Sequence, residues 1–100
     1  MNAFTAIKPA DDIRTFMPDI NDAEYELRAK LRTMRNCASA LIVKTESNTA
    51  RAIAWMCSEY VTAYIYAHAH PDILEEVARF CNRLMVTAMQ AEAIDDGGVS

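Results

Sequence analysis

Turn-forming residues are almost absent from the interior of this chain. Both glycines stand at positions 97 and 98, and the three prolines, Pro9, Pro18 and Pro71, stand at candidate boundaries between elements. A sheet of many strands needs frequent turns, which glycine and proline favour. Long helices with short connections need few of them, so the sequence predicts an all-α fold.

The composition is that of one compact domain. The chain has 100 residues, of which 52% are hydrophobic and 24% charged, and its formal net charge is -4. One domain over residues 1–100 is therefore expected. The acidic balance disfavours diffuse attraction to nucleic acid or anionic lipid. The first dozen residues lack the pattern of a secretory signal, and the uncharged run over residues 60–71 is too short to span a bilayer, so we expect a cytoplasmic protein.

The N-terminal half predicts one short and one long helix. Apolar residues at helical spacing predict a short helix over about residues 10–17, which Pro18 ends. Asn21 with Glu24 three residues later resembles a capping pair at the start of a long helix, about residues 21–45. The apolar stripe of that helix is Ile20, Leu27, Leu31, Met34, Ala38 and Leu41.

The C-terminal half predicts two further helices. Ser47 and Asn48 can cap a helix over about residues 49–69, and Pro71 fits the first position of a third, about residues 71–94. The inward stripe of the second helix is Ala50, Ile53, Cys57, Val61, Tyr64 and His68. Short connections make neighbouring helices antiparallel, so we predict a three-helix bundle with a short N-terminal helix. Residues 1–9 and 95–100 are expected to be flexible tails.

The segment from Ala52 to Pro71 is nearly free of charge, and Glu59 is its only ionised residue. Most of this segment lies in the helix predicted over about residues 49–69. One face of that helix can pack in the core, but large aromatic side chains also lie on the opposite face. Exposed tryptophan and tyrosine side chains are typical of interfaces. The predicted partner or dimer interface consists of Arg51, Trp55, Glu59, Thr62 and Tyr66.

An alternative is that the N-terminal segment covers this aromatic face within the same chain. That segment contains apolar residues that could complete a four-element core, namely Phe4, Ile7, Ile13 and Phe16. The two interpretations differ in whether Trp55 stays exposed, and full burial of Trp55 within one chain would exclude the interface.

A basic stripe lies beside the core stripe of the first long helix. Arg28, Arg32 and Arg35 fall on one flank and could hold phosphates or the carboxylates of an acidic partner. Local pairing, such as Glu24 with Arg28, is the simpler interpretation in an acidic chain.

The cysteines and histidines do not form a recognisable site. Cys37, Cys57 and Cys81 fall at similar heights in the bundle, but no CxxC or HxxxH pair accompanies them. We expect Cys57 and Cys81 in the core, Cys37 at its edge, and no metal or cofactor. His68 and His70 are two residues apart and point to different sides of a helix. No spacing suggests a catalytic triad or dyad, so no catalytic residue and no enzyme activity are expected.

These features favour a non-catalytic protein-interaction module that forms a homodimer through its second long helix and modulates or inhibits a partner protein. Small acidic helical chains without motifs are common among accessory proteins of phages and plasmids, and this is an analogy of type. The alternative function is a small nucleic-acid-associated regulator that uses Arg28, Arg32 and Arg35.

Overall fold

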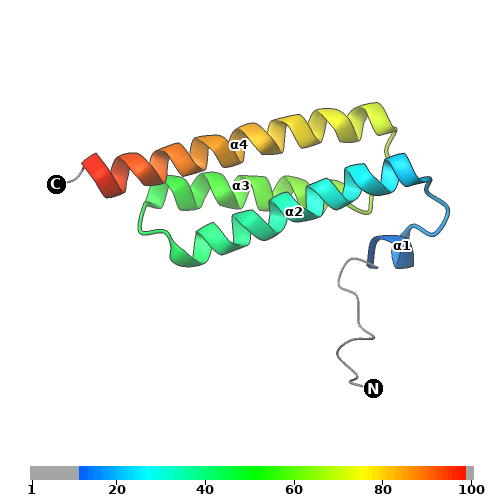
Figure 1. The fold of residues 1–100 in the computed structure, drawn as a ribbon, viewed down its shortest axis with the longest axis horizontal. Helices are drawn as coiled ribbons and strands as arrows, with labels where there is room; N and C mark the ends of the chain where they lie inside the picture. Colours follow the sequence, from blue (N-terminus) through cyan, green and yellow to red (C-terminus); the bar gives the residue numbers. More distant parts are fainter. Residues whose placement is uncertain (1–11, 99–100) are drawn as a thin grey trace, which may run out of the picture.

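The computed structural model describes residues 12–98. These residues form four helices and no strand: α1 (Asp12–Phe16), α2 (Asp22–Lys44), α3 (Asn48–Tyr64) and α4 (Pro71–Gly98). Helices α2, α3 and α4 pack against one another, and α2 and α4 run in one direction while α3 runs in the other (Figure 1). The predicted all-α bundle with a short N-terminal helix is confirmed.

The predicted helix starts are confirmed by their caps. Asn21 Oδ1 accepts a hydrogen bond of 2.8 Å from the backbone N–H of Glu24. Ser47 Oγ accepts one of 3.0 Å from the N–H of Ala50. Pro71 is the first residue of α4, where its missing N–H has no helical partner to lose. Each cap satisfies a backbone donor that the helix itself leaves free.

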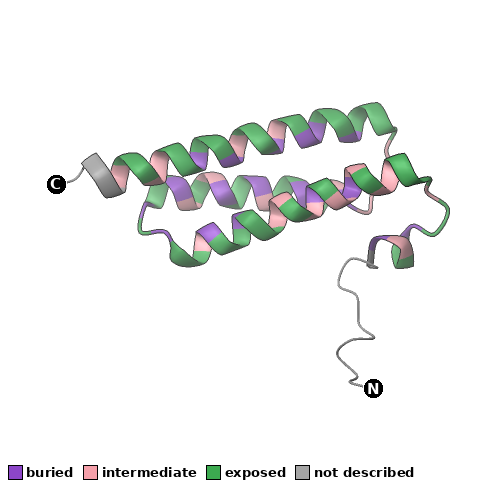
Figure 2. Ribbon diagram, in the orientation of Figure 1, coloured by how far each residue is buried: buried purple, intermediate pink, exposed green. Residues whose placement is uncertain are grey.

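The core lies where the three long helices face one another (Figure 2). Its buried members are Leu31, Ala38 and Leu41 from α2, Ala54, Cys57, Val61 and the adjoining Ile65 from α3, and Leu74, Val77, Ala78, Cys81, Met85 and Ala88 from α4. Burying a large side chain of this kind contributes about 1.5–3 kcal/mol. Small alanines from all three long helices are among these core residues.

Helix α3 ends at Tyr64 and not at residue 69. The N–H of Ile65 still bonds to the Val61 carbonyl, but the N–H of Ala67 turns back to the Tyr64 carbonyl at 3.1 Å. The inward position predicted for His68 is therefore incorrect, because the chain has left the helix and His68 is exposed. The connection then leads directly into Pro71, which disfavours a helical conformation in the preceding residue.

Helix α4 continues beyond residue 94 to Gly98. Its last turns reach the α2–α3 connection, where the Ser47 hydroxyl donates a hydrogen bond to the Asp95 carboxylate. Residues 95–98, predicted as part of a tail, are therefore helical. The other predicted tail residues, 1–9 and 99–100, lie outside the described part of the chain.

Helix α1 docks beside the start of α2 (Figure 1). Arg14 donates to the Ile20 carbonyl at 3.1 Å and pairs with Asp22 at 2.8 Å. Its guanidinium carbon also lies 4.6 Å from the centre of the Tyr25 ring. These contacts come from a single side chain, so Arg14 links α1 to the start of α2.

Candidate functional site

The face of α3 opposite the core carries large apolar side chains in contact with solvent. Trp55 is 51% exposed, Met56 46% and Tyr60 42%. Glu59 and Thr62 are also exposed on this helix. We call this set, Trp55, Met56, Glu59, Tyr60 and Thr62, the α3 face.

Two of the five residues predicted for this interface have side chains that contact neighbouring segments of the chain. Arg51 donates to Asn48 Oδ1 at 2.9 Å and to the Thr45 carbonyl at 2.6 Å, which ties its side chain to the α2–α3 connection. Tyr66 follows the end of α3, and its ring centre lies 4.9 Å from that of Phe16. Counting helical turns failed at Tyr66 because the helix has already ended. Trp55, Glu59 and Thr62 are all exposed on α3.

Met56 and Tyr60 belong to this surface although they were not among the predicted interface residues. They are four positions apart and therefore neighbours on the helix surface. The Tyr60 ring meets the half-buried Phe80 ring of α4 edge to face, with 4.8 Å between ring centres. This contact extends the aromatic surface from α3 onto α4. The four-residue spacing between Met56 and Tyr60 is the sequence feature that could have identified them as part of this surface.

The described part of the N-terminal segment does not cover Trp55. Ile13 is fully buried and Phe16 reaches Tyr66, so α1 packs at the opposite end of α3 from the Ser47 cap. Phe4 and Ile7 lie outside the described residues. About half of the Trp55 surface stays exposed. Trp55 is therefore not fully buried within one chain, which would have excluded an interface.

Arg28 is buried and acts inside the bundle. Its Nε and Nη2 atoms donate to Glu24 Oε2 at 3.0 and 2.7 Å. Nη1 donates to the carbonyls of Ile65 and Tyr64 at 2.7 and 3.4 Å, and Nη2 also donates to Ala67 at 2.8 Å. All five guanidinium donors are thereby used. The positive charge of Arg28 at the C-terminal end of α3 also interacts favourably with the negative end of the helix dipole.

The predicted arginine stripe consequently does not form one surface. Arg28 is buried, whereas Arg32 and Arg35 are half-buried. The guanidinium of Arg28 has no donor left for an external phosphate or carboxylate. Any anion contact on this flank is limited to the other two arginines.

The cysteines fall into one buried pair and one exposed residue. Cys57 and Cys81 are buried opposite each other, with Cys57 Sγ 3.7 Å from the Cys81 carbonyl and Cys81 Sγ 4.0 Å from the Cys57 carbonyl. The hydrogen bond with Cys81 and burial raise the pKa of the Cys57 thiol. Cys37 is exposed. Among residues 13–95 no three histidine, cysteine or acidic side chains are grouped as a metal site requires.

Two further findings bear on function. Within the described residues, no helix combines the length and the apolar character needed to cross a bilayer. No protein-family model, curated protein or solved structure matches the chain. Evidence on function therefore comes from the surfaces described above.

Proposed function

We propose that this chain is a non-catalytic, cytoplasmic protein-interaction module that forms a homodimer through the α3 face and modulates or inhibits a partner protein. The observation that carries the proposal is the half-exposed Trp55, with Met56 and Tyr60 beside it. Tryptophan and tyrosine bury large areas with little loss of rotamer freedom, and they dominate binding energy at interfaces. A contiguous apolar surface of this kind is unusual on a protein that remains alone.

The α3 face is suited to a second copy because it carries little charge. Glu59 is its only ionised side chain, so two copies can meet without several like charges being brought together. The nucleic-acid alternative receives no comparable support, since Arg28 is engaged inside the bundle.

Sedimentation velocity of the wild-type chain and of Trp55→Ala tests the dimer. We expect concentration-dependent dimerisation of the wild type and a loss of about 2 kcal/mol of association energy in the variant. Val43→Ala is the matched control, because Val43 is an apolar residue that is 86% exposed on α2. A wild-type chain that stays monomeric, or equal effects of the two substitutions, would contradict the proposed dimer.

A further inference from the structure

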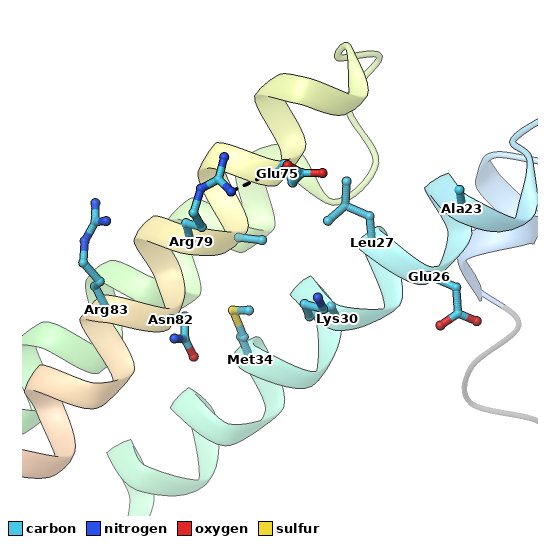
Figure 3. Close-up of a pocket in the computed structure, with 10 residues that line it drawn as sticks. Ala23, Glu26, Leu27, Lys30, Met34, Glu75, Arg79, Asn82 and Arg83 are labelled. Atoms are coloured by element: carbon cyan, nitrogen blue, oxygen red, sulfur yellow. Dashed lines mark ion pairs between the residues drawn. The ribbon is translucent and has the colours of Figure 1, made fainter.

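A second surface lies between α2 and α4, on the side of the bundle away from the α3 face. It is a groove of about 830 Å³, lined by Ala23, Glu26, Leu27, Lys30 and Met34 from α2 and by Glu75, Ala78, Arg79, Asn82 and Arg83 from α4. Figure 3 shows Leu27 and Met34 pointing from α2 toward α4. We call it the α2–α4 groove.

The floor of the α2–α4 groove is apolar. Leu27 and Met34 are partly buried and pack against the core, and Ala78 is buried below them. Leu27 and Met34 are seven residues apart, which is two helical turns or about 10.5 Å. A helix lying in the groove could place apolar residues on this floor at the same two-turn spacing.

The length of the surface also suits a helix. Asn82 lines the groove, and Val86 and Met89 follow it along α4 at spacings of four and three residues. Val86 and Met89 are both exposed, so apolar side chains are accessible on α4 beyond the groove. The lining residues extend from Ala23 to Met34 along α2, a rise of about 16.5 Å, which corresponds to three turns of a partner helix.

The charges around the groove favour an acidic partner. Three of its lining side chains are cationic and two are acidic, although the whole chain carries a net charge of -4. Glu75 pairs with Arg79 at 3.6 Å, and Arg79 also pairs with Glu76, so these side chains offer no spare charge. The other charged side chains of the lining are Glu26, Lys30 and Arg83. Lys30 and Arg83 are in no ion pair among the residues that the structure describes. Arg79 and Arg83 point away from α2 in Figure 3, so they flank the apolar floor and leave it open.

We infer that the α2–α4 groove binds an amphipathic helix of a partner protein, with apolar residues on the floor and carboxylates on the flank that faces Arg83. This adds a second surface to the one proposed for dimerisation. A nucleic-acid backbone would use the cations but not the apolar floor. An apolar helix without acids would leave Lys30 and Arg83 without partners.

The inference is tested with a designed amphipathic peptide of about 18 residues, long enough to form three turns and more. It carries leucines at heptad spacing and glutamates on one flank, and a control peptide carries lysines in place of the glutamates. Fluorescence anisotropy of the labelled peptides measures binding to the full chain. We expect the acidic peptide to bind, and Arg83→Glu to weaken its binding roughly three- to tenfold. Lys44→Glu, the same change in charge at an exposed site outside the groove, should leave binding unchanged.

Met34→Ala provides a second variant on the floor and should weaken binding of the same peptide. Failure of the acidic peptide to bind, equal binding of the lysine peptide, or insensitivity to Arg83→Glu would each overturn the inference. A change in oligomeric state in Arg83→Glu would overturn it too, because the occupant would then be a second copy. Trp55→Ala should keep peptide binding, so failure of the groove and failure of the dimer can be told apart.

Discussion

Arg28 on α2 donates a 2.7 Å hydrogen bond to the carbonyl of Ile65, 37 positions later in the chain. The same guanidinium also donates to the carbonyls of Tyr64 and Ala67. One side chain therefore binds the carbonyls that the end of α3 leaves free. The mirror arrangement occurs at the other end of α3, where Arg51 donates to the Thr45 carbonyl. Each connection between long helices is thus tied by an arginine.

Replacing Arg28 with Met should destabilise the fold by about 3–5 kcal/mol. Methionine keeps much of the volume but leaves the carboxylate of Glu24 and several carbonyls without their donors, and uncompensated buried polar groups are expensive. Arg28→Lys should recover only part of the loss, because an ammonium cannot reproduce the five-donor geometry. Urea unfolding followed by circular dichroism gives the difference.

The matched control is Arg35→Met on the same helix flank. Arg35 is half-buried and makes no hydrogen bond or ion pair among the described residues, so we expect a change of about 0.5 kcal/mol or less. Similar losses in the two variants would show that the contacts of Arg28 do not stabilise the fold.

The starts of the helices could be predicted from sequence because capping is local. Asn21 and Ser47 each bond to a backbone N–H three residues later, and both ends of that bond are visible in a short window of sequence. The end of α3 could not be read in this way. Its carbonyls are taken by Arg28, whose position near them exists only once α2 has packed against α3.

The surface residues show the same contrast between what the sequence can predict and what it cannot. The exposure of Trp55 can be predicted because this residue lies in the middle of a regular helix, where the helical periodicity holds. The position of Tyr66 cannot be predicted in this way, because the helix ends at Tyr64 and the periodicity does not reveal that end. The α2–α4 groove cannot be predicted from the sequence, since its two walls come from helices that are separated in sequence and pair only in the folded chain.

Ser47→Ala should lower stability by about 1 kcal/mol, as expected for loss of an N-cap. The hydroxyl accepts from the N–H of Ala50 and also donates to Asp95, so the substitution removes both the cap and the tie to the end of α4. Ser47→Asp restores the cap but places a carboxylate beside Asp95. Chemical denaturation should therefore rank the wild type above both variants. An alanine variant as stable as the wild type would mean that the cap contributes nothing.

The three thiols should react at very different rates with a thiol reagent such as DTNB. Cys37 is exposed, whereas Cys57 and Cys81 are buried. The raised pKa of Cys57 also keeps its thiolate scarce near neutral pH, and the thiolate is the reactive form. We expect one thiol to react in the native protein and all three in denaturant. Cys37→Ser should abolish the native reaction, and rapid reaction of that variant would contradict the buried placement of the pair.

Ile13→Ala tests the relation between α1 and the α3 face. Ile13 is fully buried, so the substitution should lower stability by about 2 kcal/mol or more, whereas Phe16→Ala should have a smaller effect because Phe16 is largely exposed.

Trp55 is the only tryptophan, so acrylamide quenching of its fluorescence reports on that position alone. At concentrations where the chain is monomeric, quenching should be the same in the wild type and in both variants, since α1 packs near Tyr66 and not near Trp55. Stronger quenching in Ile13→Ala would instead mean that the N-terminal segment shields the aromatic face, and the case for a dimer through α3 would lose its basis.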